Sequence, residues 1–263
     1  MNNTAIRIGR YKLLGIDTNA LSISDLNQLI AAAVNKDEKW IIANHNLHSI
    51  YIYHRDPKMR DFYSKADYVH IDGMPLVLVG RLLGYPLRRE QRVTYADWIW
   101  PLASDAEKHG WRIFYLGSRP GVAAEGAEVL CRKYSDLQIT TAHGYFNKEN
   151  LEENQAILDA INTYKPNVLM VGMSMPRQEH WILENLDLLQ ANIILTSGAC
   201  LDYVAGEVPT PPRWMGELGL EWSYRLLTAP KHVWQRYLIE PWFVLYLFLK
   251  DLLFVRPHKN QPL

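Results

Sequence analysis

Short apolar runs alternate with longer stretches of helical period along most of the chain, and this alternation restricts the fold more than any other feature. Helical period is seen over residues 95–109, 121–134 and 148–164. The runs typical of strands are WIIAN (40–44), YVHI (68–71), WRIFYLG (111–117), LQITTA (137–142), NVLMVG (167–172) and NIILTSG (192–198). Strands that alternate with helices build βαβ units, so the pattern predicts an α/β fold with helices on both faces of a mostly parallel sheet.

Small and polar residues gather where five of these runs end. The segments are ANHN (43–46), IDGMP (71–75), GSRPG (117–121), GMSMPRQEHW (172–181) and SGACLDYVAG (197–206). The carboxyl ends of parallel strands meet at one edge of a sheet, and open α/β sheets bind ligands in the crevice beyond that edge. The sequence therefore predicts a ligand site built from these segments.

Composition argues against several other classes of protein. The 263 residues can bury a sizeable core. The 28 basic side chains are balanced by 28 acidic ones, whereas nucleic-acid binders usually carry a basic excess, so we expect no nucleic-acid partner. Cys131 and Cys200 form no CxxC pair, which suits a reducing cytoplasm. The start of the chain lacks an apolar core of secretory-signal length.

Asp72 directly follows an apolar run and precedes Gly73, and two interpretations of it stay open. It could be the N-cap of a helix that begins near Pro75, because Asp is a favoured cap residue and Pro suits the first turn. It could instead be a general base in a water-poor cleft, where its carboxylate would take a proton from a sugar hydroxyl. Gly73 would then let a substrate approach the backbone closely.

Two further strand ends carry candidate ligand contacts. GSRPG resembles a phosphate-binding turn, in which backbone N–H groups near Ser118 and Gly121 open a helix. Neither GxGxxG nor GxxxxGK occurs, so a dinucleotide fingerprint and a P-loop are both missing. In MPRQEHW, Gln178 is a candidate for binding a sugar or a base edge, while Glu179 also suits the first turn of a helix.

Metal ligands are scarce in the sequence. His45 and His48 stand three residues apart beside Asn44 and Asn46, but no further ligand follows at zinc spacing. We expect these residues to surround a ligand or to bind backbone. No Asp-x-Asp occurs, so the usual carboxylate pair that holds a divalent ion under a diphosphate is absent. We expect neither a metal nor a cofactor.

The pattern changes after Gly206, and we place a boundary near Glu207. Basic side chains there alternate with Trp214, Trp222, Trp234 and Trp242. The apolar run that follows is interrupted by Lys250 and Asp251 and falls short of the roughly 20 residues of a membrane span. A helical hairpin packed on the domain is one interpretation. The density of Trp and basic residues favours an element that lies on an anionic membrane surface.

Six motifs in order resemble the WecG/TagA/CpsF family of bacterial glycosyltransferases, over about residues 11 to 238. They are ADYVHIDGMPLV (66–77), RVTYAD (92–97), YLGSRPGVA (115–123), GMSMPRQEHW (172–181), SGACLDYVAG (197–206) and PPRWMGELGLEWSYRLLTAP (211–230). The resemblance implies a Rossmann-like domain over residues 1–206 and a helical, membrane-associating appendage over 207–263. It also implies that Asp72 is the catalytic base.

The resemblance implies an inverting, metal-independent hexosyltransferase. Such an enzyme moves a sugar from a UDP-sugar to a polyprenyl-diphosphate-linked sugar acceptor. It would act as a peripheral protein at the cytoplasmic face of the bacterial inner membrane. Its product would serve a capsule, an exopolysaccharide or another cell-envelope polysaccharide.

Site residues are expected at both substrates. Arg92 and the amides near Ser118 and Gly121 are candidates for stabilising the diphosphate; Asn44, Asn46 and Gln178 are candidates for sugar contacts, and Asp202 for the nucleotide. Further substrate contacts are expected from Gly73, Thr94, Gly117 and Glu179. The membrane or the lipid diphosphate is expected to meet Arg213, Arg225, Lys231 and Arg236.

Two alternatives to this function stay open. One is a catalytically silent membrane scaffold of the same fold. The other is a different nucleotide-dependent Rossmann-like enzyme, such as a dehydrogenase, although its fingerprint is missing. A homo-oligomer stays open as well.

Overall fold

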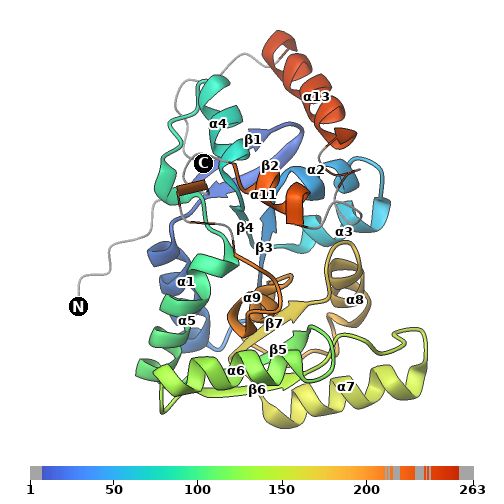
Figure 1. Ribbon diagram of the computed structural model, residues 1–263. Coiled ribbons are helices and arrows are strands. Elements are labelled where there is room, and N and C mark those ends of the chain that lie inside the picture. The colour runs from blue at the N-terminus through green and yellow to red at the C-terminus, as the bar shows by residue number, and fades with distance from the viewer. Residues whose placement is uncertain are drawn as a thin grey trace.

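A computed structural model describes residues 8–210, 212, 214–215, 220–228, 234, 236 and 238–254 (Figure 1). The strands are β1 (Gly9–Leu13), β2 (Ile16–Ala20), β3 (Trp40–His45), β4 (Tyr68–Ile71), β5 (Arg112–Gly117), β6 (Gln138–Ala142), β7 (Val168–Gly172) and β8 (Ile193–Thr196). The first helices are α1 (Ile23–Lys36), α2 (Leu47–Tyr53), α3 (Pro57–Lys65), α4 (Met74–Leu82), the 3-10 turn η1 (Arg89–Gln91) and α5 (Tyr95–His109). They are followed by α6 (Val122–Lys133), α7 (Leu151–Tyr164), α8 (Arg177–Asn185), α9 (Cys200–Ala205), α11 (Glu221–Thr228) and α13 (Glu240–Phe254).

The main sheet has six strands in the order β4-β3-β8-β7-β5-β6, and every neighbouring pair is parallel. All six strands coincide with the apolar runs of the sequence, and α5 spans the stretch with helical period over 95–109. The predicted α/β fold with a parallel sheet between helices is therefore confirmed. Figure 1 shows the sheet running through the molecule from β4 to β6.

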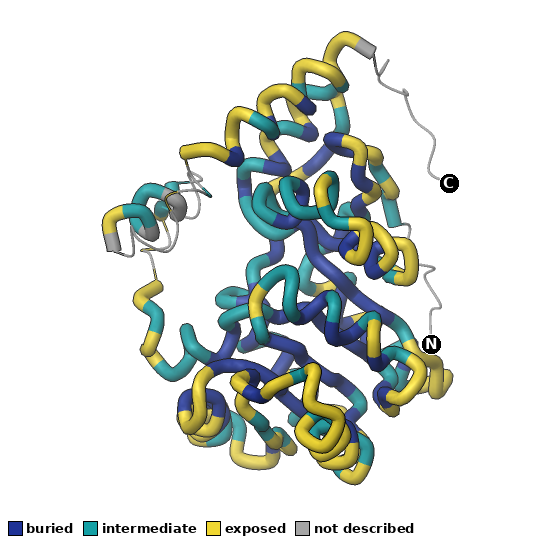
Figure 2. Tube along the Cα trace, turned by 90° about the vertical axis from the view of Figure 1, so that its right-hand side faces the viewer, coloured by how far each residue is buried: buried dark blue, intermediate teal, exposed yellow. Residues whose placement is uncertain are grey.

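Alternate strand residues supply the two faces of the sheet with separate cores. One cluster joins Ile42, Ile113 and Met170 to α1, α5, α6 and α9. The other joins Ile41, Phe114 and Val171 to α3, α7 and α8. Because side chains alternate along a strand, a continuous apolar run fills both cores at once. Figure 2 shows the strands buried between helices whose outer turns are exposed.

An N-terminal hairpin, β1–β2, was not predicted. Its strands pair antiparallel around Leu14 and Gly15, which both have positive φ, at 53° and 78°. A two-residue turn of this kind usually carries Asn-Gly or Asp-Gly, so Leu-Gly gave no recognisable signal. The hairpin lies beside β4, where the side-chain oxygen of Asn19 accepts a hydrogen bond from the amide of Val69 at 2.8 Å.

The C-terminal helix α13 packs on the hairpin and on α2. Val244 and Leu247 are buried in a third cluster together with Leu13 and residues of α4. Asp251 accepts a hydrogen bond from the amide of Leu14 at 2.7 Å. The last described helix therefore shares a core with the first strands of the chain. No helix in the described part of the chain combines the length and the apolar character needed to cross a membrane.

Candidate active site

The direction of the chain through the sheet reverses between β5 and β7. After β5 the chain passes through α6 to β6 at one edge, and after β7 it passes through α8 to β8 in the opposite direction. α6 packs in the first cluster and α8 in the second, so these helices lie on opposite faces. Such a switch point opens a crevice beyond the carboxyl ends of its strands. Here the strand ends are Gly117 and Gly172, which are register partners.

Glycine is required at these strand ends because the backbones approach each other closely. A Cβ on Gly117 would lie 2.4 Å from the carbonyl oxygen of Gly172. A Cβ on Gly172 would lie 2.3 Å from the carbonyl oxygen of Gly198, just beyond β8. The floor of the crevice is therefore bare backbone, which is where a ligand can approach most closely.

The predicted residues Ser118 and Asp202 lie together at this switch point. The hydroxyl of Ser118 donates a hydrogen bond to the carboxylate of Asp202 on α9. The hydroxyl of Tyr115 lies 3.3 Å from that of Ser118 and donates to the carbonyl of Gly198 at 2.9 Å. Gly121 is the N-cap residue of α6, so the first turn of α6 begins just beyond these strand ends.

Gln178 and Glu179 open α8 beside the same strand ends. Both are buried. The side-chain nitrogen of Gln178 donates to Oε1 of Glu179 at 2.8 Å, and its oxygen accepts from the amide of Gly198 at 3.2 Å. Burial raises the pKa of Glu179 from its ordinary value of 4.5 to about 7.

Asp72 lies at the carboxyl end of β4, and the capping interpretation of it is wrong. The N-cap residue of α4 is Gly73, whose φ of 105° turns the chain from the strand into the helix. The carboxylate of Asp72 instead accepts hydrogen bonds from the side-chain amides of Asn44 and Asn46, each at 3.3 Å. Three predicted site residues therefore meet at this point.

Asn44 links Asp72 to the middle of the sheet. Its side-chain oxygen accepts from the hydroxyl of Thr196, at the end of β8, at 2.8 Å. Asn46 is the N-cap of α2, where its oxygen accepts from the amide of Ser49 at 3.0 Å. Both asparagines are thus anchored by one amide atom and present the other to the carboxylate.

Arg92 and Thr94 lie beside the end of β4, because Arg92 bridges to Ile71 and the amide of Val93 donates to the Ile71 carbonyl. Both side chains bind Asp97, Arg92 at 3.0 Å and Thr94 at 3.1 Å. Ser118 follows β5, four strands away in the sheet order. At about 4.8 Å per strand, roughly 19 Å separates the two ends of the site. The structure thus places Arg92 with Asp72 and apart from Ser118 and Gly121.

The histidines near Asp72 have structural partners. His45 is buried, stacks on the ring of Tyr63 at 3.8 Å and lies 2.9 Å from the Ser49 hydroxyl, and its burial lowers its pKa to about 3. Nδ1 of His48 lies 2.9 Å from both carboxylate oxygens of Glu240 on α13. In the described part of the chain, no group of three or more His, Cys, Asp or Glu residues could hold a metal ion.

Comparison with known proteins decides the family. Residues 11–258 match the glycosyl transferase family WecG/TagA/CpsF. The chain belongs to this family. A WecG/TagA/CpsF member is expected to be a glycosyltransferase, which agrees with polar groups gathered along the carboxyl edge of a parallel sheet.

Two similar proteins carry more specific names. One is the N-acetylglucosaminyldiphosphoundecaprenol N-acetyl-beta-D-mannosaminyltransferase of Bacillus spizizenii, which is 28% identical over 205 residues and aligns with 78% of this chain and 77% of its own length. The other is the Staphylococcus aureus protein of the same name, which is 23% identical over 242 residues, or 88% of each chain.

The C-terminal residues predicted for the membrane are only partly described. Arg213 and Lys231 lie outside the described residues. Arg225 belongs to α11, but its side chain is not described. Arg236 is described and half-buried. Trp214, Trp234 and Trp242 are all exposed.

Several residues of this WecG/TagA/CpsF site gave no signal in the sequence. Tyr115 and Thr196 stand within apolar strand runs and look like core residues there. Tyr63 comes from α3, which the sequence gave no reason to place beside Asp72. Tyr95 follows the predicted contact Thr94 in the RVTYAD motif but was not itself singled out. Burial raises the pKa of both hydroxyls and the charges of Asp72 and Glu179 raise it further, so both rings lie near these carboxyl groups.

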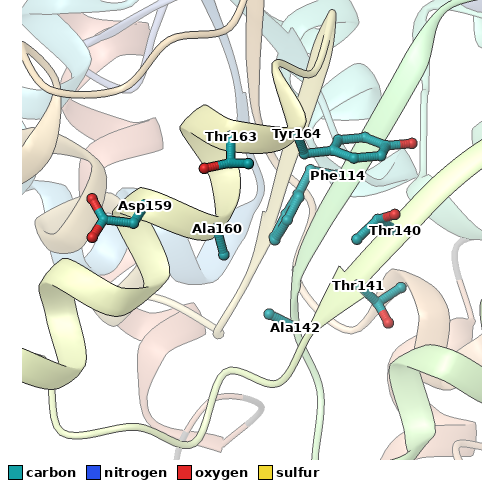
Figure 3. A pocket seen from close by; sticks show the side chains of 8 residues that line it. All are labelled: Phe114, Thr140, Thr141, Ala142, Asp159, Ala160, Thr163 and Tyr164. Atoms are coloured by element: carbon teal, nitrogen blue, oxygen red, sulfur yellow. The ribbon is translucent and has the colours of Figure 1, made fainter.

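A separate hollow lies between β5, β6 and α7 and has a volume of about 540 Å³ (Figure 3). The rings of Phe114 and Tyr164 and the side chain of Thr140 line it, and the carboxylate of Asp159 lies at its margin. None of the residues predicted for the active site lines this hollow.

Proposed function

We propose that this protein is an inverting, metal-independent glycosyltransferase that moves a sugar from a UDP-sugar to a polyprenyl-diphosphate-linked sugar. The observation that carries the proposal is the carboxylate of Asp72, which is held by two asparagine amides at the carboxyl edge of a parallel sheet in a chain of this family. The names of the two relatives suggest N-acetylmannosamine as the first sugar to test and N-acetylglucosaminyl-diphosphoundecaprenol as the first acceptor.

The reaction is a single displacement. The acceptor hydroxyl oxygen attacks the anomeric carbon while Asp72 takes its proton. The bond from that carbon to the β-phosphate oxygen breaks, and UDP leaves with the bonding electrons. Attack from the face opposite the leaving group inverts the anomeric configuration.

The length of the site supports an extended donor. We place the uridine at the switch point, near Ser118 and Asp202, with the amides that open α6 beside it. The diphosphate then extends across the ends of β7 and β8, toward Gln178 and Asn44, so that the anomeric carbon bonded to it lies near Asp72. Asp72 reaches the acceptor at the far end, and Arg92 beside it is assigned to the lipid-linked diphosphate.

The membrane face is assigned to α13. One side of this helix is buried on the hairpin, and the other exposes apolar residues at helical spacing, namely Trp242, Leu245, Tyr246, Leu249, Leu252 and Leu253. α4 adds exposed Leu78 and Leu82, and its core residues belong to the same cluster. We propose that this surface lies on the cytoplasmic face of the inner membrane, where the lipid-linked acceptor resides.

Release of UDP from a panel of UDP-sugars, with a lipid-diphosphate-linked N-acetylglucosamine as acceptor, tests the proposal. We expect one donor to be turned over, with formation of the opposite anomer. Activity in EDTA is expected to match activity in magnesium, since no Asp-x-Asp pair exists to hold a cation. Complete loss in EDTA that magnesium or manganese restores would contradict the metal-independent mechanism.

A further inference from the structure

Glu179 lies beneath the proposed donor site rather than at its surface. It stands in the first turn of α8, directly after the loop from β7, and its side chain is fully buried. Glu184, on the same helix, is instead partly exposed and pairs with Lys58 and Lys148. The two carboxyl groups of α8 therefore have different environments, and only Glu179 faces the carboxyl edge of the sheet.

The contacts of Glu179 determine which way the amide of Gln178 points. Oε1 of Glu179 accepts a hydrogen bond from the nitrogen of that amide, at 2.8 Å. The oxygen of the amide then faces the N–H of Gly198, at 3.2 Å. Without an acceptor at Glu179, the side-chain amide of Gln178 could rotate by half a turn, and its nitrogen rather than its oxygen would then face the N–H of Gly198.

Gly198 connects the side-chain amide of Gln178 to the residues of the proposed nucleotide site. Its carbonyl accepts from the Tyr115 hydroxyl at 2.9 Å, and that hydroxyl lies 3.3 Å from Oγ of Ser118. Ser118 in turn donates to Asp202. A continuous chain of polar contacts therefore runs from Glu179 to Asp202, although the two residues come from helices that follow different strands.

We propose that Glu179 is a positioning residue of the donor site, which fixes Gln178 and the Gly198 peptide and thereby places Ser118 and Asp202 for the uridine diphosphate. This role rests on the proposed function, because it assigns UDP to the switch point. Glu179 itself does not touch the donor. It acts through Gln178.

A purely structural role explains the burial of Glu179 less well. Burying a carboxyl group is costly, and an apolar side chain of similar size would be neutral or stabilising there. Oε2 of Glu179 has no hydrogen-bond partner among the described residues, and neither has the buried hydroxyl of Tyr95. The raised pKa of Glu179 agrees with this cost. Packing alone would therefore favour methionine or leucine over glutamate.

Titration calorimetry with UDP tests the role without requiring turnover. UDP is used alone because a direct contact of Gln178 with the sugar would otherwise confuse the result. We expect Glu179→Met to weaken UDP binding about tenfold, the effect of losing one buried hydrogen-bonded contact, while the Tm stays the same or rises. Glu179→Gln keeps an acceptor oxygen and is expected to bind UDP within about threefold of wild type. Glu184→Met is the matched control on the same helix and should leave the Kd unchanged.

A double-mutant cycle tests whether Glu179 acts through Gln178. Gln178→Met should weaken UDP binding about as much as Glu179→Met, and the double variant no more than either single one. Additive losses, or a Glu179→Met variant that binds UDP like wild type, would overturn the positioning role alone. A wild-type protein that does not bind UDP would overturn the proposed donor and, with it, this role.

Discussion

The carboxylate of Asp72 and the amides of Asn44 and Asn46 form the smallest unit that the proposed chemistry needs. Both amides donate to the same carboxylate oxygen, Oδ2. This arrangement orients the carboxyl group and leaves Oδ1 outside those two bonds. An asparagine in place of Asp72 can accept the same two hydrogen bonds but cannot take a proton.

Asp72→Asn is therefore expected to keep the fold and UDP binding and to lower kcat by about 100-fold or more, the scale of a lost general base. Single-turnover kinetics of sugar transfer measure it, with the Kd for UDP as the test of an intact site. Asp67→Asn is the control, because Asp67 stands just before β4, at the other end of that strand from Asp72, and accepts from the amide of Ile41. If both variants turn over like wild type, Asp72 is not the base.

Glu179 makes stability depend on pH in a definite direction. Burial raises its pKa to about 7 in the folded protein, against 4.5 ordinarily. Its neutral form is the one that suits burial, so its contribution is complete below pH 4.5 and is lost as the pH rises through 7. The loss is on the order of 3 kcal/mol at full ionisation. His45 and His70, whose pKa values burial lowers to about 3, destabilise the protein in the opposite direction, as the pH falls below 6.5.

Glu179→Gln is thus expected to gain stability relative to wild type as the pH rises from 5 to 8. Urea unfolding of both proteins at each pH measures the difference, and the comparison cancels the histidine contributions. A difference that stays constant with pH would mean that Glu179 ionises normally in the folded protein.

At the scale of whole elements, the strand ends decide the shape of the site. Gly117, Gly172 and Gly198 bring the ends of β5, β7 and β8 into contact through backbone alone. A Cβ on Gly172 would lie 2.3 Å from both the Gly198 carbonyl oxygen and the Tyr115 hydroxyl. These two groups are themselves hydrogen-bonded, so neither can move without disturbing the other.

Gly172→Ala is expected to cost about 1–3 kcal/mol of stability, the usual cost of overpacking, and to weaken UDP binding. Urea unfolding and calorimetry measure the two effects. In Gly9→Ala the three atoms nearest the new Cβ all belong to the end of the Tyr11 side chain, which can turn away, so that variant should stay within about 0.5 kcal/mol of wild type. Equal free energies of unfolding for the two variants would show that β8 can move away from β7 without loss of stability.

The six sheet strands could be predicted because each stands in a short run of strand-forming residues. β3, β5 and β7 are buried on both faces and end in residues the sequence had already marked, whereas the edge strand β6 is half-exposed. The position of Asp72 at the carboxyl edge followed from the same pattern. The order of the strands did not, because the apolar runs are alike and carry no information about their neighbours. For that reason the pairing of Ser118 with Asp202, and the separation of Arg92 from both, appear only in the structure.

Considered as a whole, the molecule gathers much of its exposed apolar surface on α13 and α4, at one end. In Figure 1, α13 and α4 lie at the top and α7 at the bottom. α13 has 15 residues, or about 22 Å of helix, which is too short to cross a hydrocarbon core of about 30 Å. It can lie along a membrane with its exposed side inserted, since its other side is held by Val244 and Leu247 in the core.

This packing changes how the membrane proposal has to be tested. Cutting the chain before Glu207 would remove Val244, Leu247 and the Asp251–Leu14 hydrogen bond along with the exposed side chains. A truncated chain could then lose membrane binding only because its third core cluster is broken. Substitutions confined to the exposed side of α13 avoid this difficulty.

The double variant Trp242→Gln with Leu253→Gln is expected to release the protein from vesicles that contain anionic lipid, because these side chains are 72% and 75% exposed and available for insertion. Each buried apolar side chain contributes roughly 1.5–3 kcal/mol, so the partition coefficient should fall by at least about 100-fold. Co-sedimentation with vesicles measures it. Leu151→Gln with Leu188→Gln is the control, since these leucines are 85% and 56% exposed but lie at the start of α7 and just after α8. At high salt, the control variant should still bind vesicles as strongly as wild type does, because salt does not screen apolar insertion. If the α13 variant sediments with vesicles as wild type does, the membrane surface lies elsewhere on the molecule.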